Sequence, residues 1–294
     1  MRACVLIATY RPLGAVVPLR ALKQQAHPDF GIVLVTEIGE RAWDGDVGRA
    51  QGLLDGAKVV EAPFTPYHSP THSLNLALEA VRPLGGVSSV ALLADFAWPD
   101  PHWLGILLGA LEGGVAAVGG GKCSHPAEDP WRCGATIALR NPCLGHPLLP
   151  LGLDRVPADG AAVVHPFQRA FNLGNLAFRL SDGLAVNGFE ERFAGGHGYE
   201  DENFVRRLVA FRRAPAVLAR SAVIHHYWPY EKGYKPLLKA EARPWAAGLS
   251  NQALDRLLTD AEILVGMTSA QRVDRIEAPP EALEPRSLAE QGPQ

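Results

Sequence analysis

The stretch "VSSVALLADF", residues 87–96, decides the fold class, because it is a short apolar run that ends in an acidic residue. A run of this length, rich in aliphatic and β-branched side chains, is typical of a strand that is buried on both faces of a sheet. Similar runs occur at residues 3–10, 30–38 and 115–121. These four segments are therefore predicted to be strands of one sheet.

Segments with helical spacing separate these strands. Residues 13–25, 73–81 and 102–114 place apolar side chains three and four positions apart, and glycines close the last of them. Alternating strands and helices predict an α/β fold with a doubly wound, mostly parallel sheet. Such sheets bind ligands at the carboxyl ends of their strands. The strand-end candidates for a binding site are Thr9, Tyr10, Thr36, Glu37 and Asp95.

The second half of the chain is less regular. Residues 121–166 are rich in Pro, Gly and Cys and predict loops and short strands. Residues 171–189 predict a strand that turns into a short helix, and residues 213–228 predict a strand that ends in histidines. The predicted organisation is a first half of regular strands and helices (1–120), a less regular second half of the same domain (121–232), C-terminal helices (233–273) and a disordered tail (274–294).

Composition excludes several classes of protein. The chain has 294 residues, of which 47% are hydrophobic, and a net charge of −3, so an overall basic nucleic-acid binder is excluded. No run reaches the roughly 18 apolar residues that cross a bilayer, and the N-terminal apolar run is too short for a signal peptide. A cytoplasmic location is predicted. Cys4, Cys123, Cys133 and Cys143 form no Cys-x-x-Cys pair, which favours reduced thiols over a zinc site.

The stretch "GGHGYEDENFVRRL", residues 195–208, places two carboxylates side by side behind a glycine-rich loop. One interpretation of Glu200 and Asp201 is structural, since acidic side chains in the first turn of a helix complement its dipole. The other is catalytic, since a helix start holds a carboxylate firmly while presenting it to a cleft. The rest of the chain has to decide between the two.

Several motifs occur in a fixed order around this stretch. They are "ATYRP" after the first strand, Asp95 before "WPDPHWL", "NLGNLAFR" (172–179), "VNGFEERF" (186–193) and "VIHHYW" (223–228). The chain resembles the GT-A glycosyltransferases, particularly the large inverting family, and its downstream half resembles the C-terminal part of the β-galactosyltransferases. The resemblance covers roughly residues 3–230. It implies that residues 1–120 are the nucleotide-sugar-binding half and residues 121–232 the acceptor and catalytic half of one GT-A domain. It implies a sugar transfer from a nucleoside-diphosphate sugar, with UDP favoured, to an acceptor hydroxyl.

The resemblance implies roles for individual residues. Asp201 corresponds to the general base and Glu200 to a residue that positions the acceptor or donor sugar, with Gly196, His197 and Gly198 in the acceptor loop. Independently of the resemblance, Trp228 just after the histidines is a candidate surface for stacking on a sugar ring. The nucleotide-sugar would be bound by Thr9, Tyr10, Arg11, Thr36, Glu37, Asn75, Asp95 and Arg179. For Asn75, helix packing is an equal alternative, and for Arg179 a surface salt bridge. Thr36 or Glu37 can accept the uracil N–H, and a guanine or thymine donor stays open.

The chain departs from the family at the metal site. The family balances the diphosphate charge with Mn²⁺ or Mg²⁺ held by a D-x-D strand end. Here Ala94 and Phe96 flank Asp95 in place of the outer acids, and Asp100 is expected to cap the next helix. His225, or failing it His226, matches the metal-binding histidine of the family. The alternatives are a metal held by Asp95 and a histidine, a metal-independent enzyme, or an inactive one.

Two competing functions follow from these departures. A non-catalytic nucleotide- or carbohydrate-binding protein fits the missing acids but not the retained pair Glu200 and Asp201. A sugar-nucleotide nucleotidyltransferase requires a glycine-rich basic signature after the first strand, where the chain supplies only Arg11 and one glycine. The acceptor and the donor sugar are not specified by any motif.

Overall fold

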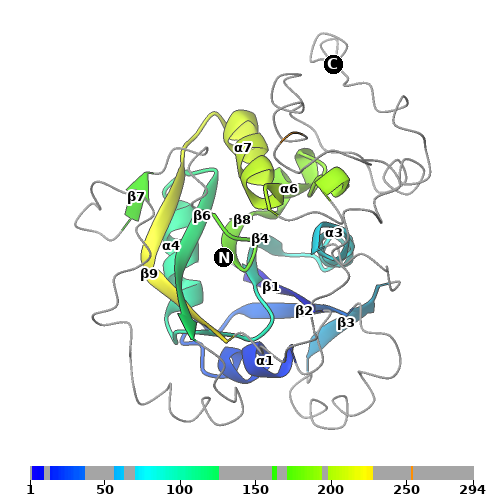
Figure 1. The fold of residues 1–294 in the computed structure, drawn as a ribbon, viewed down its shortest axis with the longest axis vertical. Coiled ribbons are helices and arrows are strands. Elements are labelled where there is room, and N and C mark those ends of the chain that lie inside the picture. The colour runs from blue at the N-terminus through cyan, green and yellow to red at the C-terminus, as the bar shows by residue number, and fades with distance from the viewer. Residues whose placement is uncertain are drawn as a thin grey trace.

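The protein is described here by a computed structural model, which covers residues 2–9, 14–36, 56–62, 70–125, 161–163, 171–193, 198–227 and 253. The strands are β1 (Arg2–Thr9), β2 (Phe30–Thr36), β3 (Ala57–Glu61), β4 (Val87–Leu93), β5 (Ala97–Pro99), β6 (Ala117–His125), β7 (Ala161–Val163), β8 (Asn175–Arg179) and β9 (Ala216–Tyr227). The helices are α1 (Val16–Leu22), α3 (Pro70–Val81), α4 (Trp103–Glu112), α6 (Leu180–Ala185) and α7 (Glu200–Arg212), with a 3-10 turn η1 (Glu191–Phe193). Figure 1 shows their arrangement.

The strands belong to one mixed, mostly parallel sheet, in the order β3-β2-β1-β4-β8-β6-β9-β5. The pairs β3 with β2, β2 with β1, and β1 with β4 are parallel, as is the pair β6 with β9. β8 is antiparallel to both β4 and β6, so these two strands run in the same direction. The short strands β5 and β7 pair antiparallel with β9. The predicted α/β sheet is thus confirmed, and the antiparallel insertion of β8 is the feature that the strand and helix rhythm does not predict.

Helices cover both faces of the sheet, which explains the continuous apolar runs of the central strands. On one face α3, α6 and α7 pack over Cys4, Leu6, Val90 and Leu92. On the other face α1 and α4 pack over the alternate residues of the same strands, such as Val5. Burial raises the pKa of the Cys4 thiol to about 12, so this cysteine is an inert core residue, as its place in a strand predicts.

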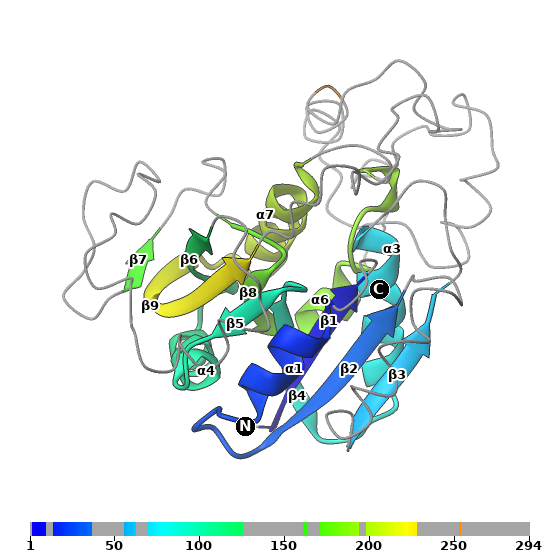
Figure 2. The same ribbon diagram turned by 60° about the horizontal axis from the view of Figure 1, so that its bottom comes forward.

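The direction of the strands determines which helix ends lie together. We call the edge at which β1, β2, β4, β6 and β9 end the carboxyl edge (Figure 2). A turn of three residues joins α7 to β9, and Pro215 in this turn accepts a hydrogen bond of 2.8 Å from the N–H of Ala116 at the other edge. Since α7 packs along the sheet and ends there, its first turn lies at the carboxyl edge. α3 precedes β4 in the same way and also begins at this edge.

Several predictions fall outside the described residues. They concern the C-terminal helices apart from residue 253, the tail at 274–294, and Cys133 and Cys143. Cys123 is described only as a backbone position in β6. In the part of the chain that the structure describes, no helix is long and apolar enough to span a bilayer.

Candidate functional site

The carboxyl ends of β1 and β4 bring Thr9 and Asp95 together. Both residues are buried, and Gly14 packs against both of them. A Cβ at Gly14 would lie 2.5 Å from Thr9 Oγ1 and 3.0 Å from Asp95 Oδ2, so only glycine fits this position. Thr36 at the end of β2 is directly opposite Thr9 in the parallel register. The predicted strand-end residues Thr9, Thr36 and Asp95 therefore share one edge, while Tyr10, Arg11 and Glu37 lie outside the described residues.

A sharp turn carries the chain from β4 past Asp95 into β5. Phe96 adopts a left-handed conformation with φ +53°, and its N–H donates a hydrogen bond of 2.8 Å to the carbonyl of Gly14. A bulky residue rarely adopts a positive φ, so this turn is a strained backbone position. Its consequence is that β5 leaves β4 and crosses to pair with β9 at the far side of the sheet.

The strand-end histidines lie beside β5. Ala97 is opposite His226, and Trp98 is opposite His225. Because Ala97 is only two residues from Asp95, this register brings the end of β9 close to the turn that carries Asp95. His225 is fully buried, and its Nε2 lies 3.1 Å from Asp100 Oδ1. The prediction that Asp100 caps α4 is wrong, since its carboxylate contacts His225, and the N–H of Leu104 in the first turn donates to the side chain of Gln25 instead.

The predicted metal ligands Asp95 and His225 belong to separate elements, the turn after β4 and the end of β9. Within the described ranges, no group of three or more His, Cys, Asp or Glu side chains is close enough to hold a metal. His225 directs one ring nitrogen to Asp100, an arrangement also found for histidines that bind a metal through their other nitrogen. The roles predicted for Asp95, His225 and His226 at a metal stay predictions.

The acid pair opens α7 at the carboxyl edge. Gly198 and Tyr199 approach the helix with φ +79° and +76°, which turns the chain sharply into Glu200. Glu200 and Asp201 are partly exposed, and Asp201 Oδ1 accepts a hydrogen bond of 2.9 Å from the N–H of Glu202. Three acids thus occupy the positive end of the helix dipole. The structural interpretation is therefore correct for Asp201 Oδ1, which accepts an N–H of the first turn.

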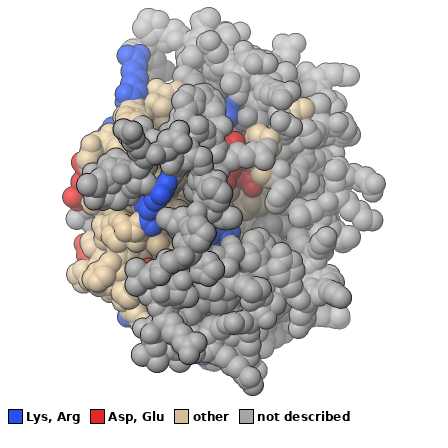
Figure 3. Space-filling model, turned by 60° about the vertical axis from the view of Figure 1, so that its left-hand side comes forward, with Lys and Arg blue, Asp and Glu red and all other residues tan. Residues whose placement is uncertain are grey.

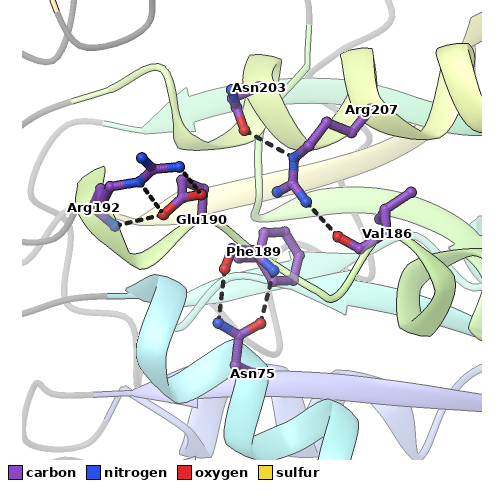
Figure 4. A network of polar contacts seen from close by, with 7 residues as sticks. All are labelled: Asn75, Val186, Phe189, Glu190, Arg192, Asn203 and Arg207. Atoms are coloured by element: carbon purple, nitrogen blue, oxygen red, sulfur yellow. Dashed lines mark hydrogen bonds and ion pairs between the residues drawn. The ribbon is translucent and has the colours of Figure 1, made fainter. Parts of the chain in front are cut away.

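A buried polar network supports this end of α7 (Figure 4). The side chain of Asn75 on α3 accepts a hydrogen bond of 2.7 Å from the N–H of Phe189 and donates one of 2.9 Å to the carbonyl of Phe189. It also donates to Glu191 Oε1 at 2.8 Å, and Glu191 Oε2 lies 3.3 Å from His72 Nδ1. The side-chain amide of Asn75 thus binds the segment that leads toward α7. The family resemblance implies a place near the nucleotide for Asn75, and that role stays a prediction.

The same segment contains a buried ion pair. Arg192 donates two hydrogen bonds of 2.9 Å to the two carboxylate oxygens of Glu190, and both side chains are buried. Burial alone would raise the pKa of Glu190, but the charge and hydrogen bonds of Arg192, together with the charge of Arg207, hold this pKa below its usual value. Arg207 itself is buried and binds the carbonyl of Val186 at 2.6 Å.

Sequence reasoning did not single out Glu190, Glu191 and Arg192. The available signal was the placement of three charged residues between Phe189 and Phe193, two aromatic residues that are both buried. Charged side chains between buried aromatic neighbours are themselves buried only when they are paired. The pattern therefore indicates internal ion pairs, although it does not identify their partners.

Arg179 is separated from the other predicted site residues. In the antiparallel register it lies opposite Ser89, four positions before Leu93, so about 13 Å of strand separate it from the carboxyl edge. Its guanidinium donates to the carbonyls of Leu111 and Val115 at 2.6 and 2.7 Å and thereby holds the C-terminal end of α4. The remaining predicted residues, Gly196, His197 and Trp228, lie outside the described residues.

The described surface carries charges of both signs. Figure 3 shows Lys and Arg side chains interspersed with Asp and Glu on the face turned to the viewer. Charges of both signs on the described surface are in keeping with the nearly balanced 28 basic and 31 acidic residues of the chain.

Solved structures share this architecture over most of the chain. S. aureus TarS 1–349 in complex with UDP-GlcNAc matches 95% of this chain and 71% of its own, with 13% identity and a TM-score of 0.59. The mannosyltransferase PcManGT from Pyrobaculum calidifontis, in complex with GDP-Man and Mn²⁺, matches 94% of this chain and 83% of its own, with 19% identity and a TM-score of 0.53. No protein-family model and no curated protein sequence matches this chain.

These likenesses confirm the predicted GT-A fold. At identities below one fifth they establish the fold and not the activity, because one fold supports many functions. The resemblance of the downstream half to the β-galactosyltransferases is not tested by these structures and stays a prediction.

Proposed function

We propose that the protein is an inverting glycosyltransferase that transfers a sugar from a nucleoside-diphosphate sugar, with UDP favoured, to a hydroxyl group of an acceptor. The observation that supports the proposal is that three elements end or begin at the same edge of the sheet, the carboxyl edge. These are Thr9 with Asp95, the histidine end of β9, and the first turn of α7 with Glu200 and Asp201. A doubly wound sheet binds nucleotides at this edge, and the matched transferases carry UDP-GlcNAc and GDP-Man.

The proposed reaction uses Asp201 as the general base. The acceptor oxygen attacks the anomeric carbon of the donor sugar, its proton passes to the Asp201 carboxylate, and the bond between that carbon and the diphosphate oxygen breaks. Asp201 suits this role because its Oδ1 accepts the N–H of Glu202, which orients the carboxylate at a rigid helix start. Glu200 is assigned to holding a sugar hydroxyl, and Thr9 and Asp95 are assigned to the nucleotide side of the site.

Ligand-induced stabilisation tests this proposal. The melting temperature of the full chain is measured with UDP, UDP-sugars and GDP-sugars, each with and without Mn²⁺, and donor hydrolysis is followed in parallel. A nucleotide-sugar that raises the melting temperature and is slowly hydrolysed supports a transferase. The absence of any stabilisation by all these nucleotides contradicts the proposal.

A second candidate is a nucleotide-binding protein without catalysis. The replacement of the outer metal-binding acids by Ala94 and Phe96 favours it, and the described residues contain no assembled metal site. Stabilisation by a UDP-sugar that is neither hydrolysed nor transferred to any member of a wide acceptor panel would favour this second candidate over the first.

Substitutions at the two sides of the site are expected to affect binding differently. Asp95→Ala is expected to weaken UDP binding by about tenfold, because this buried carboxylate lies beside Thr9 at the strand ends. Glu200→Gln is expected to change UDP binding far less, because it belongs to the first turn of α7. Calorimetric titration of UDP into both variants, with and without Mn²⁺, measures the difference. Equal losses in both variants would contradict the assignment of Asp95 to the nucleotide side.

A further inference from the structure

Asn175 links three elements at the centre of the fold. It is the first residue of β8 and is almost completely buried. Its Nδ2 donates hydrogen bonds to the carbonyls of Gly121 on β6 and Ala222 on β9, at 2.8 and 3.0 Å. Its Oδ1 accepts a hydrogen bond of 2.7 Å from the indole N–H of Trp103 on α4. Both amide hydrogens and the oxygen are thus engaged, each by a different element.

The two carbonyls that Asn175 binds lie at an irregularity of the sheet. Gly120 is opposite Ala219, but the next residue of β6, Gly121, is opposite Val223. Three residues of β9, at positions 220–222, therefore have no partner in the β6 register. A Cβ at Gly120 would lie 2.3 Å from the carbonyl oxygen of Ala222 and 2.3 Å from Asn175 Nδ2. The bulge thus requires a glycine on one strand and the Asn175 amide on the other side.

This bulge determines where the histidines lie. An insertion of three residues, an odd number, reverses which side chains face each side of the sheet. If β9 kept the register that pairs Gly120 with Ala219, His225 would lie three positions, about 10 Å, further along β6. It would also face the opposite side of the sheet. With it, His225 lies opposite Trp98 and contacts Asp100.

The same asparagine lies beside the Asp95 turn. Leu93, the last residue of β4, is opposite Asn175, and the N–H of Ala94 donates to the carbonyl of Gly174 at 3.0 Å. We propose that Asn175 is a positioning residue that sets the place of the histidine end of β9 relative to Asp95 by holding the β9 bulge. Its importance for donor binding rests on the proposed function, whereas its effect on the histidines does not.

The test uses Asn175→Ala and Asn175→Asp in the full chain. Alanine removes both donors, and aspartate keeps the shape but turns a carboxylate toward two carbonyl oxygens. Two readouts are recorded below the melting temperature of each variant: the ring signals of His225 and His226 in a ¹³C-histidine-labelled protein, and the affinity for UDP with Mn²⁺. We expect both histidine ring signals to shift and UDP binding to weaken by about tenfold or more.

Two controls separate positioning from a general loss of stability. Trp103→Phe removes the indole donor together with part of the ring, and leaves both bonds from Nδ2 to the bulge. Leu107→Ala opens a cavity under α4, where Leu107 is fully buried, and removes none of the hydrogen bonds of Asn175. Both controls are expected to lower the melting temperature while leaving the histidine ring signals and UDP affinity close to those of the parent.

Unchanged histidine signals in folded Asn175 variants would overturn the proposal, as would equal shifts in Leu107→Ala. If the Asn175 variants do not fold, the parent protein decides: slow solvent exchange of the Asn175 side-chain amide protons supports the proposal, and rapid exchange overturns it. If the parent binds no UDP, the proposed function loses its support, while the histidine signals still decide the role of Asn175.

Discussion

Asp201→Asn is expected to reduce sugar transfer by about 10²–10⁴-fold while leaving UDP binding close to that of the parent. The substitution is nearly isosteric, and the amide oxygen can still accept the N–H of Glu202, which Asp201 Oδ1 accepts at 2.9 Å. The start of α7 is therefore preserved. What is lost is a group that can take the proton from the acceptor hydroxyl. The measurement is the transfer rate at saturating donor, together with a UDP titration.

Glu202→Gln is the matched control for this prediction. Glu202 is the third acid in the first turn of α7 but is buried, unlike Asp201. Its substitution removes the same charge from the same helix end, so any effect of the helix dipole is reproduced. We expect Glu202→Gln to retain most of the transfer activity of the parent. A rate for Asp201→Asn within about tenfold of the parent would contradict its role as the base.

Arg192→Met is expected to lower the free energy of unfolding by about 3–5 kcal/mol, because it leaves the buried carboxylate of Glu190 without its partner. The pair makes two hydrogen bonds of 2.9 Å through the Arg192 side chain, and Glu190 is 1% exposed. Replacing both residues by apolar ones of similar size removes the uncompensated charge as well. The double variant Glu190→Met, Arg192→Met is therefore expected to be more stable than Arg192→Met alone. Urea unfolding of the three proteins measures these differences.

The pH dependence of this effect has a definite sign. Because the folded pKa of Glu190 is lowered, the unfolded chain binds more protons between the two pKa values, and the pair stabilises the folded protein increasingly as the pH rises through this window. Its contribution is complete above the unfolded pKa of about 4.3 and is lost as the pH falls through the folded pKa. The gap in stability between the parent and Arg192→Met should therefore narrow in acid. A gap that is independent of pH would contradict the assignment of the effect to the Glu190 charge.

Local pattern in the sequence determined much of the framework. The apolar runs at residues 3–10, 30–38 and 87–96 contain β1, β2 and β4, because strands that are covered on both faces bury consecutive apolar residues, such as Val33 to Val35 and Val90 to Leu93. The alternation of strands with helices predicted the parallel part of the sheet. It thereby also predicted that Thr9, Thr36 and Asp95 lie at the same edge, where their strands end. The acids of residues 200 and 201 opened a helix as predicted. Each of these results depends on neighbours within one element.

Tertiary structure alone decided the contacts between distant segments. The amide of Asn75 meets Phe189 across 114 positions of the chain, and His225 meets Asp100 across 125. Which carbonyl or carboxylate a polar side chain reaches depends on how whole elements dock, and no periodicity encodes that. The bulge in β9 is the clearest case. The residues on both sides of it have ordinary strand composition, and only the packing of β6, β8 and β9 around Asn175 fixes the face on which each histidine lies.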